Sequence, residues 1–222
     1  MENCVRIGLM ADTHGSLQAL ENSIAALENA GVDALVHLGD FCDSVQTKGL
    51  ADIVRMLCRK RVFAVMGNND YQVLNRLKNY STDMTAKSRH LVLSYLTSTP
   101  VLRRMDHVCF AHSLPYDDIR SFYEPIDDGT TARAADVFSQ TVDHILFCGH
   151  SHSPAVFTLN CGRVTQNAMG KRKNICFDAK KRYIVIVGAP SAGECGIFDR
   201  KRNCYERVFL RQRRDFSFDK PW

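Results

Sequence analysis

The sequence lacks any apolar run long enough to cross a membrane. Its first apolar stretch, residues 5–11, is cut off by Asp12 and His14, which makes it too short for a membrane span or for the hydrophobic segment of a secretion signal. Internal repeats, low-complexity stretches and linkers are absent as well, which argues against fibrous and repeat architectures. We therefore expect a soluble, cytoplasmic protein with no membrane partner and a single domain over residues 1–222.

Paired metal-binding cysteines are also missing. Nine cysteines are present, but they form no Cys-x-x-Cys motif, so a structural zinc site held by thiolates is not indicated. Their number is odd, and most lie in apolar runs such as Val108-Cys109-Phe110. This distribution favours reduced, largely buried thiols over a framework of disulfides.

Acidic residues are scarce in the last third of the chain. Residues 1–162 have a net charge of −4 and residues 163–222 a net charge of +9, which together give the total of +5. A basic extension at about 211–222 contributes to this excess and could contact an anionic partner such as a nucleotide, a nucleic acid or a phosphorylated protein. Solvated turns and a charged tail are the favoured interpretation, because no aromatic residues are interleaved for base stacking.

The first third of the chain predicts alternating strands and helices. Apolar runs at 5–11, 34–38 and 62–66 are typical of buried strands, and apolar residues recur at helical spacing over 17–30 and 47–61. Ser16 and Gly31 are suitable caps for the first of these helices. A β-α-β-α-β order favours a parallel sheet with helices packed on it.

The rest of the chain contains many short strand candidates. Two sheets packed face to face, with helices outside, would accommodate them. A Pro- and Asp-rich loop is expected at 114–130 and a helix at 131–140. The strand candidates are 90–95, 100–105, 107–111, 144–148, 155–159, 163–166, 175–177, 183–187, 196–198 and 205–210.

Five polar clusters follow apolar runs that read as strands. Ligand sites in α/β sheets gather at the carboxyl ends of strands, so clusters at these positions are expected to meet. They supply Asp, Asn and His without any thiolate, a set that suits Mn, Fe, Ni, Co or Zn. The clusters are Asp12-Thr13-His14, Gly39-Asp40, Gly67-Asn68-Asn69-Asp70, His112 and Gly149-His150-Ser151-His152.

The order of these ligands suits a pair of metal ions. Two cations about 3.5–4 Å apart repel each other, so a site for both needs a shared anionic ligand. Asp40 is the natural bridging carboxylate, because Gly39 allows close approach. Asp12 and His14, two residues apart, can reach one ion together. His150 and His152 have the same spacing and can serve one ion or one ion each, while Asn68 and His112 complete the set.

The succession D-x-H, G-D, G-N-x-D, H and G-H-x-H resembles the signature of the calcineurin-like metallophosphoesterase superfamily. The resemblance extends from residue 5 to about residue 191 and is strongest to the small YfcE-like phosphodiesterases, which also carry a glycine-rich turn after the histidine pair. It implies a four-layer α/β/β/α sandwich of two mixed sheets flanked by helices. It also implies two divalent metal ions, with manganese expected and Fe, Ni, Co or Zn as alternatives.

The resemblance also implies a ligand set for each ion and a reaction. Asp40 would bridge the two ions, and a metal-bridging hydroxide would attack a phosphodiester of a small molecule, a nucleotide among the candidates. His14 or His112 could assist proton transfer. The alternatives are a phosphomonoesterase acting on a nucleotide or phosphoprotein, and a non-catalytic binding scaffold; the complete ligand set favours the enzyme. The first ion would be held by Asp12, His14, Asp40 and His152, and the second by Asp40, Asn68, His112 and His150.

Asn69 departs from the pattern of many superfamily members, which have His at this position. Asparagine cannot act as a general acid, although it can hydrogen-bond a phosphate oxygen, so Asn68 and Asn69 are expected to contact substrate and leaving-group protonation is expected to be weak. His37 is expected in the core or behind a ligand, and Asp70 is expected to orient a ligand. By position alone, the loop at 114–130 offers Tyr116, Arg120 and Tyr123 as substrate contacts.

Overall fold

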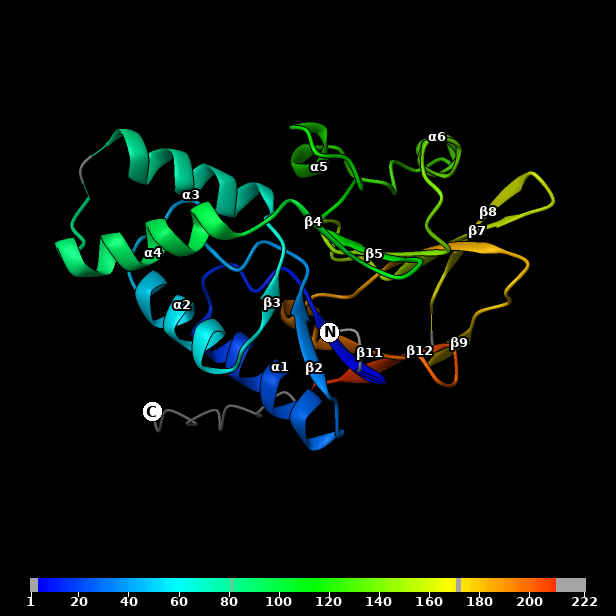
Figure 1. Ribbon diagram of the computed structural model, residues 1–222, viewed down its shortest axis with the longest axis horizontal. Helices are drawn as coiled ribbons and strands as arrows, with labels where there is room; N and C mark the ends of the chain where they lie inside the picture. The colour runs from blue at the N-terminus through cyan, green and yellow to red at the C-terminus, as the bar shows by residue number, and fades with distance from the viewer. Residues whose placement is uncertain (1–3, 81, 171–172, 211–222) are drawn as a thin grey trace, which may run out of the picture.

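The computed structural model describes residues 4–80, 82–170 and 173–210, so the basic extension at 211–222 lies outside the described residues. Two six-stranded sheets pack face to face, with helices on the outer face of each (Figure 1). The four-layer α/β/β/α sandwich of two mixed sheets is thereby confirmed.

The first sheet has the strand order β3-β2-β1-β11-β12-β9. Strands β1, β2 and β3 are parallel, whereas β11, β12 and β9 continue the sheet in antiparallel pairs. The parallel half comes from the predicted β-α-β-α-β segment. The bounds are β1 (Arg6–Met10), β2 (Ala34–His37), β3 (Phe63–Ala64), β9 (Asn174–Cys176), β11 (Glu194–Asp199) and β12 (Cys204–Phe209).

The second sheet has the order β4-β5-β6-β10-β7-β8. Its central strands β5, β6 and β10 are parallel, and antiparallel strands lie on both sides of them. The bounds are β4 (Leu102–Met105), β5 (Val108–Ala111), β6 (Ile145–Cys148), β7 (Ala155–Asn160), β8 (Arg163–Ala168) and β10 (Arg182–Ile186).

Helices α1 (Leu17–Asn29), α2 (Leu50–Arg59), α3 (Asn68–Asn79) and α4 (Ala86–Ser98) lie on the side of the first sheet. The short helix α5 (Arg120–Tyr123) and helix α6 (Ala132–Gln140) lie on the side of the second (Figure 1). A 3-10 turn, η1, spans Pro190–Ala192. Helix α1 begins where Ser16 accepts a hydrogen bond from the Ala19 amide, as expected, and Gly31 follows its end with φ +75°.

Three apolar clusters fill the spaces between the layers. One lies between the first four helices and the first sheet, a second between the two sheets, and a third between the second sheet and α6. Phe147 lies in the cluster between the sheets, with ring centroids 5.1 Å from Phe198 and 5.7 Å from Tyr205. This packing fixes the separation of the sheets and therefore the relative positions of their strand ends.

Two sequence-based expectations were wrong. The expected strand at 90–95 lies in helix α4, where Thr85 caps the amino end and Val92 and Leu96, four residues apart, are both buried. The short apolar run is compatible with either structure, and its helical spacing decided the outcome. The cysteines are not all reduced, because Cys176 and Cys204 form a disulfide, and Cys58 and Cys161 are exposed.

Within the described ranges 4–80, 82–170 and 173–210, no helix has both the length and the apolar character needed to span a lipid bilayer.

Candidate metal centre

The seven predicted ligands come together at one edge of the sandwich. Strand β1 leads into Asp12 and His14, and β2 leads into Asp40. The β3–α3 junction supplies Asn68, and the ends of β5 and β6 supply the remaining histidines, His112, His150 and His152. Strands β1, β2 and β3 are parallel to one another, as are β5 and β6, so the carboxyl ends of neighbouring strands bring together side chains that are distant in sequence.

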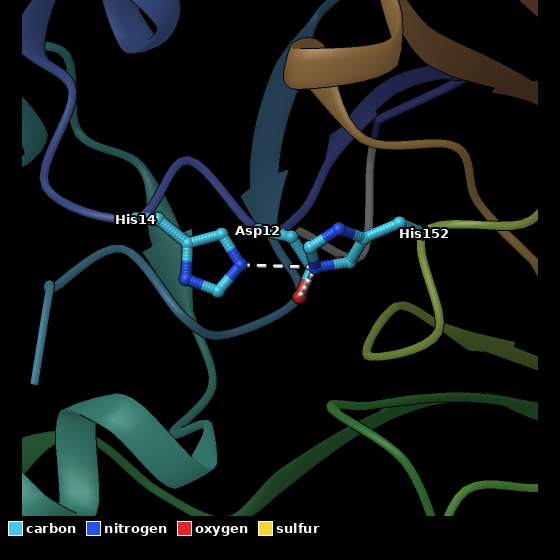
Figure 2. A group of neighbouring side chains, drawn as sticks. All are labelled: Asp12, His14 and His152. Atoms are coloured by element: carbon cyan, nitrogen blue, oxygen red, sulfur yellow. Dashed lines mark hydrogen bonds and ion pairs between the residues drawn. The ribbon is translucent and has the colours of Figure 1, made fainter.

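One group of ligand atoms consists of Asp12, His14 and His152, whose donor atoms all lie within 4.8 Å of one another. The Nε2 atoms of the two histidines are 2.9 Å apart, and His152 Nε2 lies 3.6 Å from Asp12 Oδ1. Figure 2 shows the two imidazole rings approaching from opposite sides, with the Asp12 carboxylate below His152. The group presents two imidazole nitrogens and a carboxylate to one small space.

A second group consists of Asp12, Asp40 and His112, all of them buried. Asn68 and His150 lie against it: Asn68 Oδ1 is 3.0 Å from His112 Nε2 and 3.2 Å from His150 Nδ1, and those two nitrogens are 3.1 Å apart. Asp12 therefore belongs to both groups, a sharing that the spacing of residues in the sequence did not predict.

Asp40, a member of the second group, also faces the first. Its Oδ2 is 3.9 Å from His14 Nδ1, and its Oδ1 is 3.5 Å from His112 Nε2. Asn69 approaches the same carboxylate through its backbone N–H, 2.8 Å from Oδ1, and its side-chain amide, 2.5 Å from Oδ2. The Asp40 carboxylate is thus held in a fixed orientation, facing histidines of both groups.

Strained backbone is concentrated in these ligands. Nine non-glycine residues in the described part of the chain have positive φ, and five of them are site residues with φ between +45° and +73°. Residues other than glycine rarely adopt a positive φ, and this backbone conformation persists where surrounding contacts impose it. Such strain is typical of functional sites, since it turns side chains toward a common point. The five are Asp12, His14, Asp40, His150 and His152.

Two glycines permit the close approach of the ligand loops. A Cβ on Gly39 would lie 2.7 Å from His112 Nδ1, and a Cβ on Gly149 would lie 2.6 Å from Asp12 Oδ2. Each glycine therefore brings a ligand from a different strand within reach. This explains in steric terms why Gly-Asp and Gly-His pairs occur in the sequence.

Buried polar groups orient the ligands from behind. Asp70 accepts hydrogen bonds from the backbone N–H groups of Asp40, Cys42 and Gly67 at 2.8–2.9 Å, so it fixes the backbone that carries Asp40 and also caps the start of α3. His112 Nδ1 lies 2.8 Å from the Leu38 carbonyl oxygen. That carbonyl accepts only from a protonated Nδ1, so Nε2 is left facing the site.

His37 is fully buried behind the first ligand loop. Its Nε2 lies 3.1 Å from the Thr13 hydroxyl, between Asp12 and His14, and its ring packs edge-on against Phe41. Burial lowers the pKa of His37 to about 3, so this imidazole is neutral near pH 7. Its expected position in the core behind a ligand is confirmed.

Burial and neighbouring charges shift the pKa values of three proposed ligands. Burial lowers the pKa of His112, but the charges of Asp40 and Asp12 outweigh this effect and raise it. Burial raises the pKa of Asp12, but contact with His152 and the nearby histidine charges bring it below its usual value. Burial and the proximity of His112 lower the pKa of His150 to about 4, which leaves a neutral imidazole with a free lone pair.

A segment after α5 contacts two of the ligand loops. Ser113, next to His112, donates a hydrogen bond to the Glu124 carbonyl at 2.5 Å. Asp127 interacts with Ser151, between the two histidines of the last cluster; burial raises the pKa of Asp127 while the Ser151 contact opposes the shift. This contact could not be predicted from the sequence, which indicates only that Asp127 lies in a Pro- and Asp-rich loop.

The donor set fits divalent metal ions. Asn68 Oδ1, His112 Nε2 and His150 Nδ1 lie within 3.0–3.2 Å of one another, and the carbonyl and imidazole lone pairs converge on the same space as the carboxylates. Such convergence is favourable when a cation lies among the donors. Oxygen and imidazole ligands without thiolate agree with the metals expected from the sequence.

Several residues that were expected to contact substrate make contacts with other protein groups in this structure. Asn69 is engaged with Asp40. Arg120 pairs with Glu124 and lies over the ring of Tyr116, 5.4 Å from its centroid. Tyr123 is exposed. The substrate roles of these four residues stay predictions.

Comparison with known proteins identifies similar sequences and folds. The model of the Calcineurin-like phosphoesterase superfamily domain matches residues 5–182. The uncharacterized protein MJ0912 of Methanocaldococcus jannaschii is 24% identical over 208 residues, covering 86% of this chain and 78% of that protein.

Two solved structures share the fold. A metallophosphoesterase from Sphaerobacter thermophilus has 22% identity and a TM-score of 0.73, with 95% of this chain and 90% of that chain covered. A protein described as a candidate diadenosine tetraphosphatase has 19% identity and a TM-score of 0.57, with 96% and 97% covered. The superfamily resemblance predicted from the motifs is confirmed, and the narrower likeness to the YfcE-like group stays a prediction.

Proposed function

The chain belongs to the calcineurin-like phosphoesterase superfamily, and from this premise we propose that it is a dinuclear metal-dependent phosphoesterase that hydrolyses phosphodiesters. The observation that carries the proposal is the convergence of carboxylate, amide and imidazole donors from five strand ends into two adjoining groups. Membership of the superfamily supports a hydrolase acting on a phosphoester. The two-metal mechanism and the preference for diesters are our inference.

The proposed ligands are those expected from the sequence. Asp12, His14, Asp40 and His152 would hold one ion, and Asp40, Asn68, His112 and His150 the other. The contacts of Asp40 with His14 and His112 support its shared role, and the membership of Asp12 in both groups makes Asp12 a second contributor of shared negative charge. When bound, divalent ions supply a water of lowered pKa for attack on phosphorus and neutralise the phosphoryl oxygens.

The remaining chemistry belongs to the protein. Two neighbouring residues fix the orientation of Asp40. Asn69 donates hydrogen bonds to the Asp40 carboxylate, and Asp70 accepts a hydrogen bond from the Asp40 backbone N–H. His14 and His152 are partly exposed, so substrate would approach from their side. His14 would assist proton transfer there, while His112 is fully buried and held by Leu38.

Charge supports a diester over a monoester. The hydrogen bonds and ion pairs of the seven proposed ligands join them to Asp, Asn, His and backbone groups; among the described residues, no Lys or Arg is among those partners. A phosphomonoester dianion carries one more negative charge than a diester, and enzymes commonly meet it with Arg or Lys. A site that relies on the cations alone is better matched to the single charge of a diester.

Hydrolysis of bis-p-nitrophenyl phosphate tests the proposal. We expect turnover with Mn²⁺, loss after chelation and loss in Asp40→Ala, with p-nitrophenyl phosphate hydrolysed more slowly. Isothermal titration calorimetry with Mn²⁺ separates the alternatives. Metal binding without hydrolysis of any ester would support a binding scaffold, and faster hydrolysis of monoesters would replace the diester assignment by a phosphomonoesterase.

The candidate diadenosine tetraphosphatase among the similar structures supports one further substrate class. Dinucleoside polyphosphates have a nucleotide leaving group that needs little protonation, which suits a site with Asn69 in place of a general acid. Including diadenosine tetraphosphate and cyclic nucleotides beside the p-nitrophenyl esters tests this class directly. A rate above that of bis-p-nitrophenyl phosphate would make polyphosphate cleavage the better description.

A further inference from the structure

The disulfide between Cys176 and Cys204 lies at the edge of the first sheet, on the last two strands. The two residues are direct partners in the antiparallel register of β9 and β12, with Cα atoms 4.1 Å apart and a sequence separation of 28. The other seven cysteines are free. This pair takes no part in the proposed metal centre.

The disulfide lies on the face of the sheet that points away from the second sheet. Its strand neighbours Ile175 and Tyr205 pack in the core between the sheets, and successive side chains on a strand point to opposite faces. Cys176 is exposed and Cys204 is 9% exposed. Helices α1 and α2 lie beneath the other end of this sheet (Figure 1). A small thiol can therefore reach the sulfur of Cys176 from solvent.

Cationic side chains adjoin the disulfide. Both cysteines line a cleft together with two cationic side chains, Arg6 and Arg202, and with the acidic side chains of Asp199 and Glu206. The Arg6 guanidinium is anchored by a hydrogen bond to the Ala30 carbonyl at 3.0 Å. Guanidinium groups stabilise thiolates and thereby favour both an attacking thiolate and a leaving thiolate.

The disulfide fastens an edge strand that otherwise has few attachments. Within the described part of the chain, strand β9 pairs with β12 alone, over three residues. Backbone hydrogen bonds from Phe177 to Asn203 and from Arg207 to Lys173 flank this pairing. A strand with one partner opens more easily than an internal strand, so the covalent bond contributes a large share of its attachment.

The chain ahead of β9 contacts the loop that carries the last histidine pair. The Met169 N–H donates to the Pro154 carbonyl at 3.3 Å, two residues beyond His152. Arg207, on β12, donates to the Gly170 carbonyl at 2.5 Å and forms an ion pair with the buried Glu194. Strand β12, which carries Cys204, thus contacts Gly170, and the neighbouring Met169 contacts the loop that carries His152, a proposed metal ligand.

We propose that Cys176 and Cys204 form a reversible thiol–disulfide exchange site for low-molecular-weight thiols of the glutathione class. A thiolate attacks Sγ of Cys176, the S–S bond breaks, and Cys204 leaves as a thiolate. A second thiolate attacks the mixed disulfide, which releases Cys176 as a thiolate and forms one oxidised thiol dimer. Two electrons pass to the protein, and the reverse sequence with the oxidised dimer restores the bond. Reduction loosens β9.

A redox titration tests the exchange. The full chain carrying Cys58→Ser and Cys161→Ser, which removes both exposed free thiols, is equilibrated without oxygen in buffers of reduced and oxidised glutathione. It is then quenched with acid, denatured and alkylated. Mass spectrometry should count five alkylated cysteines in oxidising buffers and seven in reducing buffers, with one two-electron transition. A count that stays at either value across the series overturns the proposal.

Hydrogen exchange and thermal unfolding test the structural consequence. Reduction should increase amide exchange at residues 173–177 and leave β1 and β2 unchanged. It should also lower Tm by about 4–12 °C, as does loss of a typical disulfide in a domain of this size. Cys176→Ser should reproduce both effects without added thiol, and Cys58→Ser serves as the matched control. Unchanged exchange at 173–177 after reduction would contradict the link between the bond and β9. None of these measurements depends on phosphoester hydrolysis.

Discussion

The side-chain amide of Asn69 donates a hydrogen bond to Asp40, with 2.5 Å between Nδ2 and Oδ2. The backbone N–H of the same residue donates to Oδ1 at 2.8 Å. Asn69 therefore holds both oxygens of the carboxylate that faces the two groups of histidines. A histidine at this position could protonate a leaving group, but Asn69 instead orients the proposed bridging ligand, so protonation of the leaving group has to come from water or from the substrate itself.

Replacement of Asn69 by His tests this consequence. We expect Asn69→His to raise kcat for phosphodiesters with alkyl leaving groups by about 10-fold or more relative to p-nitrophenyl esters, because a general acid contributes about 10²–10⁴ in rate where the leaving group is poor. The measurement is the ratio of kcat for the two ester classes at saturating Mn²⁺. Asn69→Ala, which has neither the amide nor an acid, is the control. An unchanged ratio in Asn69→His would contradict the inference that the absence of a general acid at residue 69 limits the cleavage of esters with poor leaving groups.

Asp12 and His152 should differ in their effect on metal binding. Asp12 belongs to both ligand groups and His152 to one, so Asp12→Asn should abolish the rise in Tm that Mn²⁺ produces, whereas His152→Ala should retain part of it. The rise in Tm increases with the ratio of the metal concentration to the dissociation constant of the metal. Thermal unfolding over a series of Mn²⁺ concentrations measures it.

Asp52→Asn is the matched control for this comparison. Asp52 is exposed and pairs with Arg55 on α2, away from both groups. It should therefore show the wild-type response to Mn²⁺. An equal loss of response in Asp12→Asn and His152→Ala would indicate that the two groups bind as one unit.

The convergence of the proposed ligands could be predicted because each one follows a strand whose apolar run is short and well bounded. The parallel order of β1, β2 and β3 follows from the helices between them, so the meeting of Asp12, Asp40 and Asn68 could be anticipated. The approach of His112 and His150, from the second sheet, to these three residues of the first sheet requires that the two sheets pack face to face. That was inferred from the number of strand candidates and from the family resemblance.

Other contacts depend on tertiary packing and had no sequence signal. Asn69 is adjacent to a ligand in the chain, but its bonds to Asp40 arise only when β2 and β3 lie side by side. The pairing of Cys176 with Cys204 depends on the register of β9 and β12. Helix α4 was mistaken for a strand at 90–95, because six apolar and polar residues do not distinguish the two periods.

Gly67 tests the steric requirement behind the Gly-Asn motif. A Cβ at this position would collide with the carboxylate and backbone N–H of Asp40, so Gly67→Ala should destabilise the protein by about 2–4 kcal/mol and lower metal affinity. Gly31→Ala is the control, because a Cβ there meets nothing within 4 Å and costs only the strain of a positive φ, about 1 kcal/mol. Urea unfolding gives both values. Equal losses in the two variants would show that the collision is relieved at little cost.

The buried His37 makes stability depend on pH. Its pKa is about 3 in the folded protein against 6.5 for an ordinary histidine. Between these values the unfolded chain binds a proton that the folded chain does not. Stability therefore rises with pH through this window and is lost as pH falls from about 6.5 toward 3.

Substitution of His37 by Gln removes this titration while keeping a polar side chain next to Thr13. In metal-free protein, we expect the wild type to lose up to about 1.4 kcal/mol of unfolding free energy per pH unit to this residue below pH 6. His37→Gln should be less stable at pH 7.5 because its packing against Phe41 is lost, yet its stability should fall less steeply with decreasing pH. Urea unfolding at pH 7.5, 6, 5 and 4 gives the two slopes. Parallel curves for wild type and His37→Gln would mean that His37 accepts a proton without unfolding, through rearrangement of the Thr13 loop beside Asp12 and His14.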